Sequence, residues 1–348
     1  MLVSVLATIF GLSLLMIVHE GGHYLAARFF GMRVTRFSIG FGPTLAKYQP
    51  KGSHTLFLVG AIPFMAYVMI DGMNPVDEVD PDDPDLYSNK SVFARIITIF
   101  AGPFANYLAA SVMIFALALT TGWQEPVEPV GPMVVGEVSP DSPAMAAGLK
   151  AGDVVLRAQG TAVANVQELI KVTAPRAGKP TSYLIERDGK RLPPMTITPR
   201  DINGRGVIGV TPKVDYHFRV LPIAEAASLA IELPYRYTER QLVAIQGLIR
   251  DRTTQGIMGP VGMGKIVARQ VEKGIFDFVY ILIIISVAVG MFNLLPFPAL
   301  DGGRLMFLGY ELVTRRRPNE RFEATIHALG LLFLLGVVAL VTLRDVVS

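Results

Sequence analysis

Cysteine is absent from this sequence, and its absence excludes two kinds of site at once. Disulfide bonds cannot form, and no thiolate is available to bind a metal ion. Charged residues are also scarce, at 18% of the 348 residues, and the formal net charge is only +3. Because no run of Lys and Arg has the length of a nucleic-acid-binding patch, we expect no nucleic-acid partner.

Hydrophobic residues, by contrast, make up 51% of the chain, and the mean hydropathy is +0.44. This composition is typical of a membrane protein that also has room for a soluble module. Four stretches are long and apolar enough to cross a bilayer. They cover residues 2–30, 96–121, 278–300 and 324–343. The first lacks the basic start and the small-residue cleavage site of a signal peptide, so we interpret it as a retained span.

The connection between the third and fourth stretches is rich in arginine. Loops with an excess of basic residues usually face the cytoplasm. An even number of spans then places both chain ends and the long segment 122–277 on the outer side, and segment 31–91 on the cytoplasmic side. The basic residues are Arg304, Arg315, Arg316, Arg317 and Arg321.

Two histidines and a glutamate follow directly after the uncharged residues 2–18, in the sequence His19-Glu20-Gly21-Gly22-His23. Positions four apart lie on one face of a helix, so His19 and His23 can hold one zinc ion. Glu20 is then within reach of a water molecule on that metal, as in other H-E-x-x-H sites. Ionisable groups at membrane depth are costly and usually functional, which strengthens the prediction of a metal site.

A zinc site of this kind needs a third protein ligand and one open position. His54, His217 and His327 have no motif around them, and we expect substitution of His327 to leave the metal content unchanged. Asp301 follows two prolines in N-L-L-P-F-P-A-L-D-G-G (residues 293–303), and these prolines prevent a regular helix at membrane depth. The residues alone leave two interpretations open. Asp301 is the third ligand, or it caps a helix that begins at the two glycines.

The segments between the predicted spans differ in character. Residues 33–72 alternate between apolar and polar positions and predict a β-element at the membrane face, in which Gly42-Pro43 ends the first strand. Its segment 55–70 either offers an open edge to another strand or only packs against the helices. Residues 128–213 predict a compact α+β module with a helix at residues 166–171. Residues 222–274 predict amphipathic helices on the outer face. We therefore expect domain boundaries at 1–121, 128–213, 222–274 and 275–348.

Several motifs together resemble the site-2 protease family of intramembrane zinc metalloproteases. The sequences H-E-G-G-H and N-L-L-P-F-P-A-L-D-G-G carry the resemblance, with support from F-S-I-G-F-G-P at residues 37–43 and A-G-P-F-A-N at residues 101–106. The run S-P-A-x-x-A-G-L-x-x-G-D-V-V at residues 142–155 is similar to the PDZ domains of bacterial proteases. Together with Gly259-Pro260, it resembles the regulator-of-sigma-E branch, and the resemblance covers nearly the whole chain.

The resemblance implies a polytopic α-helical membrane protein of about four spans, with a membrane-associated β-element and an inserted α+β PDZ domain. It implies His19, His23 and Asp301 as ligands of Zn²⁺, with Glu20 as the catalytic base. It also places Asn293 near the substrate backbone. The candidate substrate-binding residues are Asn293, Asn106, Pro296 and Pro298. An alternative role for Asn106 is hydrogen bonding between helices.

The implied activity is hydrolysis of peptide bonds in or near the transmembrane segment of single-span membrane proteins, such as anti-sigma factors or signal-peptide-like substrates. It would be the second cut of regulated intramembrane proteolysis. The site would lie in the inner membrane of a bacterium, and a periplasmic PDZ domain would meet a peptide or the substrate ectodomain. The alternative is a non-hydrolytic PDZ receptor or a zinc transporter, but an intact Glu20 favours hydrolysis.

Two features depart from the pattern of that family. The chain has room for one PDZ domain, whereas members of that branch often carry two. Met65 and Ala66 also replace both glycines of the I-P-x-G-G-Y-V pattern in the β-element. This second departure leaves open how closely a substrate backbone approaches the element, but it does not alter the expected chemistry.

Overall fold

The computed structural model describes residues 2–74, 80–126, 132–202, 204–214, 216–251 and 258–347. The chain divides into two compact units. The helical unit comprises Met1–Thr121 and Leu221–Ser348, and the β-rich unit comprises Gly122–Val220. The β-rich unit is therefore an insertion between the two halves of the helical unit.

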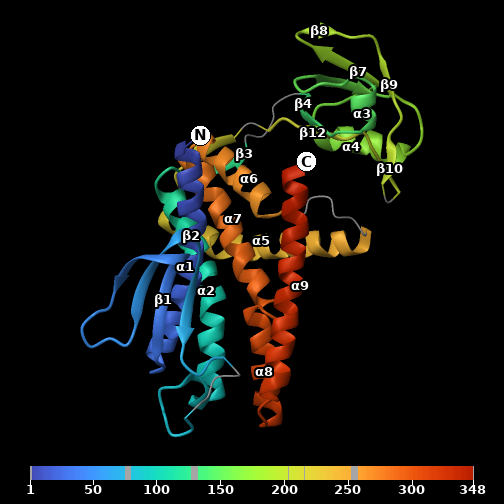
Figure 1. Cartoon of the computed structure of the whole chain (residues 1–348). Helices are drawn as coiled ribbons and strands as arrows, with labels where there is room; N and C mark the ends of the chain where they lie inside the picture. The colour runs from blue at the N-terminus through green and yellow to red at the C-terminus, as the bar shows by residue number, and fades with distance from the viewer. Residues whose placement is uncertain are drawn as a thin grey trace. The chain divides into compact units, whose positions relative to one another are not determined.

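The helical unit consists of long helices and one β-hairpin (Figure 1). Its elements are α1 (Leu2–Phe29), β1 (Val34–Tyr48), β2 (Leu56–Ile70), a short 3-10 helix (Tyr87–Asn89), α2 (Val92–Leu119), α5 (Ile223–Asp251), α6 (Pro260–Lys273), α7 (Ile275–Leu294), α8 (Asp301–Thr314) and α9 (Glu320–Val347). By length and composition, α1, α2, α7 and α9 can each cross a membrane.

These four helices correspond to the four predicted spans, with one difference at the third. That helix ends at Leu294, and the segment 295–300 that holds both prolines is not helical, as its sequence predicts. The arginine-rich connection, which we expected to be a short loop, contains the helix α8. Helices also form in the region predicted to be amphipathic, as α5 and α6. Their position on the outer membrane face stays a prediction.

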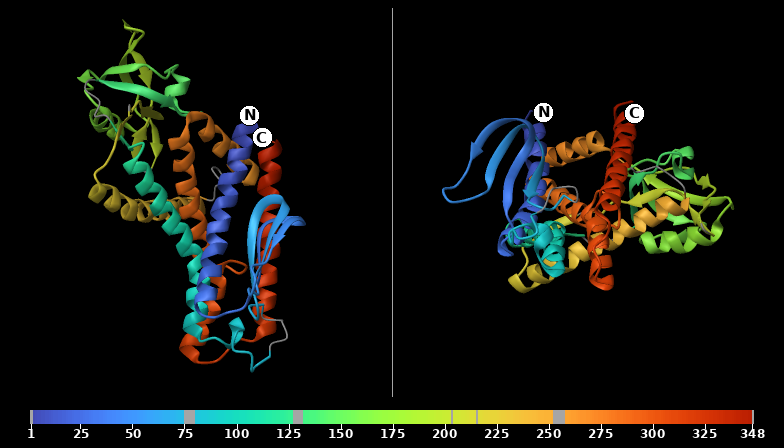
Figure 2. Two further views of the ribbon diagram at one scale, coloured as in Figure 1. Left: turned by 90° about the vertical axis from the view of Figure 1, so that its left-hand side faces the viewer. Right: turned by 60° about the horizontal axis from the view of Figure 1, so that its bottom comes forward.

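Helices α1, α2 and α7 pack side by side (Figures 1 and 2). Small residues allow this close approach, as in other membrane bundles. A Cβ atom at Gly22 of α1 would collide with the carbonyl oxygen of Ala101 in α2. A Cβ atom at Gly290 of α7 would lie 3.0 Å from the carbonyl oxygen of Pro103 in α2. The backbone of α2 is therefore held directly against both neighbours.

The β-hairpin packs against α1 and is bent into four paired segments. Residues 34–39 pair with 66–70 on one side and with 56–59 on the other, and 56–59 also pairs with 44–48. The order across the sheet is therefore 66–70, 34–39, 56–59, 44–48. We expected Gly42-Pro43 to end the first strand, but β1 continues through it as a bend. The left-handed backbone at Gly40 and Gly42 makes this bend possible.

The β-rich unit is a small sheet with two short helices and its own apolar core. Its elements are β3 (Trp123–Pro126), β4 (Met133–Val138), α3 (Pro143–Ala146), β5 (Val154–Ala158), β6 (Thr161–Ala162), α4 (Val166–Thr173), a 3-10 turn (Ala174–Arg176), β7 (Thr181–Arg187), β8 (Lys190–Arg191), β9 (Met195–Ile197), β10 (Arg200–Ile202), β11 (Arg205–Val207), β12 (Val210–Pro212) and β13 (Tyr216–Arg219). The main sheet has the order β12-β4-β5-β7-β8. The helix predicted at residues 166–171 is α4.

A buried carboxylate holds one turn of this unit together. Asp153 accepts hydrogen bonds from the N–H of Lys150 and from the guanidinium of Arg187, at 2.6 and 2.7 Å for the latter. Burial alone would raise the pKa of Asp153, but Arg187 and the Lys150 N–H outweigh burial and hold this pKa below its usual value. The A-G-D sequence seen in the module therefore has a structural role here.

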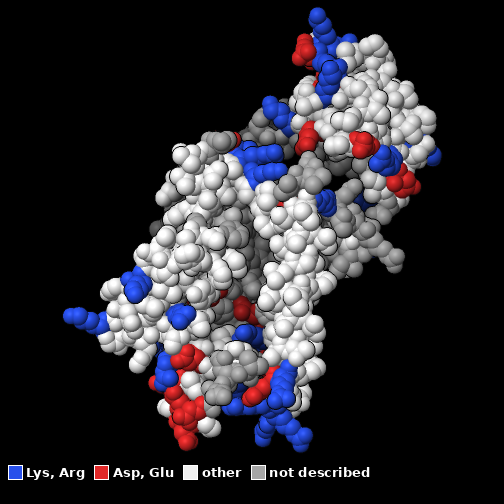
Figure 3. All heavy atoms as spheres, viewed as in Figure 1, with Lys and Arg blue, Asp and Glu red and all other residues white. Residues whose placement is uncertain are grey.

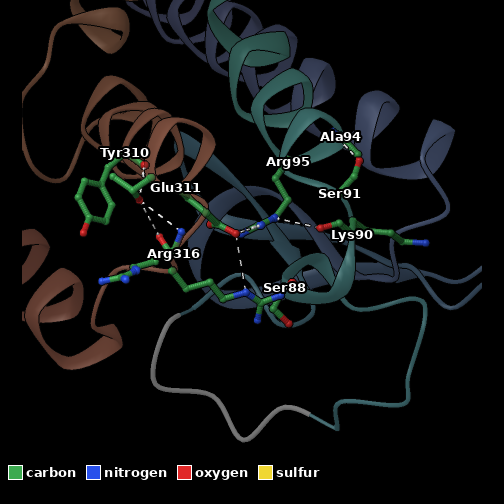
Figure 4. Close-up of polar contacts among 10 residues, drawn as sticks. Ser88, Lys90, Ser91, Ala94, Arg95, Tyr310, Glu311 and Arg316 are labelled. Carbon is green, nitrogen blue, oxygen red and sulfur yellow. Dashed lines mark hydrogen bonds and ion pairs between the residues drawn. The ribbon is translucent and has the colours of Figure 1, made fainter.

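Charged side chains gather at the end of the helical unit that carries the 3-10 helix and the connection from α8 to α9, whereas most of α9 is uncharged (Figure 3). At this end, Arg95 of α2 and Glu311 of α8 form a buried, two-pronged ion pair at 2.6 and 3.1 Å (Figure 4). The Nε of Arg95 also donates to the carbonyl oxygen of Lys90. The pair therefore ties the start of α2 to the last turn of α8.

We predict that Arg95→Met destabilises the protein far more than the paired change Arg95→Met/Glu311→Met. The single change leaves a buried carboxylate without its main partner, which costs about 3 kcal/mol, whereas replacing both partners by apolar side chains is close to neutral. Free energies of unfolding in detergent measure the difference. Arg317→Met is the control, because Arg317 is more exposed and its Nε lies 3.8 Å from Glu311. A loss no larger than that of the control would contradict the prediction.

Candidate metal centre

The two histidines of the first helix point to one spot, as their spacing predicts. His19 and His23 are 4% and 5% exposed, and their Nε2 atoms lie 3.3 Å apart. Helix α1 is regular through both residues, so the helical repeat alone brings the two rings to one face. The two rings meet edge to face, with centroids 4.9 Å apart.

Asp301 reaches the same spot from the other half of the chain. Its Oδ2 lies 3.2 Å from Nε2 of His19 and 3.3 Å from Nε2 of His23. The helix cap is Leu300, and Asp301 is the first residue of α8. Of the two interpretations that the sequence leaves open, the geometry therefore favours a ligand over a cap. His54, His217 and His327 do not belong to this cluster.

The conformation of the segment before Asp301 brings the Asp301 carboxylate to the two histidines. Pro296 and Pro298 stop α7, and Ala299 adopts a left-handed conformation with φ of 74°. A Cβ atom at Gly302 would collide with the carbonyl oxygen of Leu295. Glycine is therefore required for α8 to start tightly against the end of α7, which directs the Asp301 side chain back toward α1.

The surroundings of His23 leave one nitrogen available to a cation. Its Nδ1–H donates to the carbonyl oxygen of Thr98 at 2.8 Å, since a carbonyl can only accept. In a neutral ring, Nε2 then carries the lone pair, and it faces Asp301. A Cβ atom at Gly102 of α2 would overlap the His23 ring, so glycine leaves the space that this side chain occupies.

The side-chain amide of Asn106 supports His19 in a similar way. Asn106 is fully buried, its Nδ2 lies 3.2 Å from Nδ1 of His19, and its Oδ1 has no hydrogen-bond partner in the described part of the chain. A half-turn of the amide exchanges its two ends, and Oδ1 can then accept from Nδ1–H. This arrangement leaves the Nε2 lone pair of His19 facing the cluster.

The three ligand atoms fit a zinc ion. They lie within 4.8 Å of one another, and no described donor makes a hydrogen bond to the buried Oδ2 of Asp301. Two imidazoles and one carboxylate form a ligand set that zinc prefers, with a fourth position left for another ligand. Polar partners behind the histidines hold the rings in the required orientation, as is usual around bound metals.

Glu20 lies beside the cluster and contacts the β-element. Its Oε2 accepts a hydrogen bond from the N–H of Val68 at 3.1 Å. Val68 belongs to segment 66–70, which pairs with 34–39 on its other side. The edge of the sheet nearest Glu20 is therefore 66–70. We expected the whole of 55–70 to offer this edge, but residues 56–59 are paired on both sides and cannot accept another strand.

The predicted substrate-binding residues lie in different places. Asn106 lies behind His19, with its Nδ2 3.2 Å from Nδ1 of that ring. Asn293 lies in the last turn of α7, where its Nδ2 donates to the carbonyl oxygen of Val289. Pro296 is exposed and Pro298 half-buried in the segment before Asp301. A substrate-binding role for all four residues stays a prediction.

Several functional contacts have no local signal in the sequence. Thr98 acts through its backbone carbonyl, which any residue could provide. The N–H of Val68 is likewise a backbone group that any residue except proline could provide. Gly102 lies in the A-G-P-F-A-N motif, but its role follows only from the ring that packs against it. Knowing which residues of α2 face α1 would have been necessary to predict these contacts.

Comparison with known proteins identifies the family of this chain. The family model described as Peptidase family M50 matches residues 7–337. A provisionally named zinc metalloprotease of Synechocystis sp. is 33% identical over 99% of this chain and 95% of its own. Another from Nostoc sp. is 31% identical over 96% of this chain and 93% of its own. Metalloprotease MmpA of Caulobacter vibrioides is 32% identical over the same shares, 96% and 93%.

A solved PDZ domain of an SdrC-like protein from Listeria monocytogenes is similar to a quarter of this chain. It is 27% identical, with a TM-score of 0.21, and the match covers 25% of this chain and 90% of the PDZ domain. The helices and the site together define a membrane metalloprotease. The chain belongs to peptidase family M50, the site-2 proteases, and it is a zinc metalloprotease.

We predict that the purified protein holds one zinc ion per chain, and that His19→Ala, His23→Ala and Asp301→Ala each abolish tight binding, because two remaining ligands make an incomplete site. Asn106→Leu should weaken binding by about tenfold or more, through loss of support for His19. Glu20→Gln should retain the metal. Elemental analysis and competition with a chelator measure these effects, and full zinc occupancy in Asp301→Ala would refute the ligand set.

Proposed function

We propose that this protein hydrolyses peptide bonds in or near the transmembrane segment of single-span membrane proteins, as the second cut of regulated intramembrane proteolysis. The observation that carries this proposal is the position of the metal cluster. Its ligands lie on α1, which can cross a membrane, and at the break after α7, which can also cross one. A substrate must therefore bring its scissile bond to that depth.

The proposed chemistry divides between the metal and one carboxylate. Bound at His19, His23 and Asp301, zinc would polarise the scissile carbonyl as a Lewis acid. Glu20 accepts a proton from the attacking water as the water oxygen bonds to the carbonyl carbon. As the carbon–nitrogen bond breaks, Glu20 returns that proton to the leaving amine. The Val68 N–H holds the Glu20 carboxylate in position for both transfers.

A substrate helix hides its backbone hydrogen-bonding groups, so it must unwind before it can be cut. Unwound backbone in a membrane needs new partners for these groups. Segment 66–70 can supply them by accepting the substrate as an added strand, with the N–H of Val68 left to Glu20. Because Val68 contacts Glu20, a strand paired at this edge passes beside the proposed catalytic base.

The membrane orientation that we propose follows from the arginine-rich end of the helical unit. The Arg95–Glu311 pair places the start of α2 at that end, which we assign to the cytoplasm of a bacterial cell. Helix α2 has 28 residues, or about 42 Å, enough to cross the inner membrane. Its far end leads into the β-rich unit, which would then be periplasmic.

The β-rich unit, which we propose to be a PDZ domain, offers a site for an extended peptide. A cavity of about 370 Å³ lies between α4 and the strands β11 and β12, lined by Leu169, Ile170 and Val207 among others. Strand β12 ends the main sheet and pairs with β4 on one side. A peptide or a substrate ectodomain could pair with the other side of β12 and place apolar side chains against α4.

We predict that the wild-type protein in lipid vesicles cuts a single-span protein that has a short outer stub, and that Glu20→Gln binds this substrate without cutting it. The inactive variant should then show where the substrate lies. The natural absence of cysteine allows single cysteines to be introduced for disulfide cross-linking. Met69→Cys in the edge segment should cross-link to alternate positions along the substrate, as expected for paired strands.

Val59→Cys is the matched control for this cross-linking. Val59 is 41% exposed and Met69 is 45% exposed, but Val59 lies in a segment that is paired on both sides. Equal cross-linking at the two positions, or none at Met69, would refute strand addition. Persistent cutting by Glu20→Gln would instead refute the role of Glu20.

We also predict that removing the β-rich unit leaves zinc binding intact and lets the enzyme cut substrates whose outer domain is still large. Strands β3 and β13 pair so that Pro126 lies opposite Tyr216. Replacing residues 127–215 by a two-residue Asn-Gly turn should therefore close a natural hairpin. Cleavage of long and short substrates in vesicles measures selectivity. A truncated enzyme that still ignores long substrates would contradict a gating role for this unit.

A further inference from the structure

A histidine outside the metal cluster contacts the segment that delivers Asp301. Nδ1 of His327, in α9, accepts a hydrogen bond from the N–H of Ala299 at 3.0 Å. Ala299 lies two residues before Asp301 and has the left-handed φ of 74°. For a residue other than glycine this conformation is strained, so it persists only where neighbours hold it.

Two more residues on the same side of α9 hold this segment. A Cβ atom at Gly330 would lie 2.5 Å from Cβ and 2.7 Å from the carbonyl oxygen of Pro298, so the backbone of α9 touches the proline directly. The ring of Phe333 packs on Phe297 with centroids 5.8 Å apart. His327, Gly330 and Phe333 follow one another at intervals of three and form one contact surface.

This surface is the main place where α9 is buried. Within residues 320–345, Gly330 is the only buried residue. A second contact lies at the end of the helix, where the Asp345 carboxylate accepts a hydrogen bond from the N–H of Gly262 at the start of α6. The position of α9 along the Asp301 segment is therefore set by a few specific contacts and not by extensive packing.

The hydrogen bonding of His327 is unusual for a residue that only fills space. Because Nδ1 accepts a hydrogen bond, the neutral ring carries its proton on Nε2. That buried nitrogen finds no partner among the residues that the structure describes. An unsatisfied buried donor is destabilising, and an apolar side chain would avoid this cost. What histidine adds at this position is the acceptor for Ala299.

We propose that His327 is a positioning residue of the metal centre. By holding the Ala299 N–H, and with Gly330 seated on Pro298, it fixes the turn that places Oδ2 of Asp301 within 3.3 Å of both histidine nitrogens. Without the acceptor, the strained turn relaxes and the start of α8 rotates, which moves the carboxylate away. The proposal rests on the ligand set proposed above. It reverses the sequence-based expectation that His327 is irrelevant to the metal.

Zinc dissociation constants of the purified full-length protein test this proposal. We expect His327→Ala to weaken zinc binding by about tenfold or more, the usual effect of losing a residue that supports a ligand. His327→Asn should recover most of the affinity, because Oδ1 of asparagine can accept at a position close to that of Nδ1. A residue that serves packing alone would not be rescued by asparagine.

A pair of glycines on the same helix provides the matched control. Gly330→Ala should weaken zinc binding, whereas Gly336→Ala should not, because a Cβ atom at Gly336 meets nothing within 4 Å. Melting curves of the zinc-free variants separate metal affinity from folding, and should His327→Ala fail to fold, His327→Leu and His327→Asn replace it in the comparison.

Two results would overturn the positioning role. One is a zinc affinity of His327→Ala equal to that of the wild type. The other is a zinc affinity of His327→Asn no higher than that of His327→Ala. His23→Ala distinguishes this failure from failure of the ligand set. Loss of zinc in His23→Ala with normal binding in His327→Ala refutes only the positioning role. Retention of zinc in His23→Ala refutes the ligand set and the inference with it.

Discussion

The structure depends on bringing two imidazoles and a carboxylate together in an apolar interior. Such groups are costly to bury unless each has a polar partner. Here His23 has the carbonyl of Thr98, His19 has the amide of Asn106, and Asp301 lies between the two rings. Helix α2 supplies both supporting partners and contributes no ligand itself. Its position against α1 therefore determines the orientation of both rings, and the missing side chains of Gly22 and Gly102 are what permit that position.

The third ligand imposes a second constraint, because a helix must stop at membrane depth to present it. A break exposes backbone groups that lipid cannot satisfy, so it has to be enclosed by protein. Helix α8 starts against the segment 295–300 at Gly302, and α9 contacts this segment through His327 and Gly330. The Arg95–Glu311 pair then joins the far end of α8 to α2. Helix α2, which supports both histidines, is therefore joined to α8, which carries Asp301.

Local periodicity was sufficient to predict part of this arrangement. The spacing of His19 and His23 places them on one face of any regular helix, and the prolines before Asp301 predict the break. The four long helices also follow from composition alone. What could not be predicted depends on pairing between distant segments. Residues 56–59 and 66–70 are similarly apolar, and only the register with β1 shows that 66–70 is the edge. The contact of His327 with Ala299 spans 28 residues and has no local pattern.

The departure of Met65 and Ala66 from the family pattern has a specific structural consequence. Met65 has φ of 81°, a conformation suited to the glycine that the family pattern carries there. Pairing of Ile62 with Phe41 and of Ala66 with Ile39 holds the backbone on either side, so the bend survives at a cost of about 1–2 kcal/mol. Ala66 is buried, whereas the Met65 side chain is 53% exposed just before the edge segment. The strand therefore accommodates methionine at this position, which adds a flexible apolar side chain beside the edge. Its effect should fall on which substrate side chains are tolerated there, and the metal centre should be unaffected, because the contact between Val68 and Glu20 is formed by the backbone.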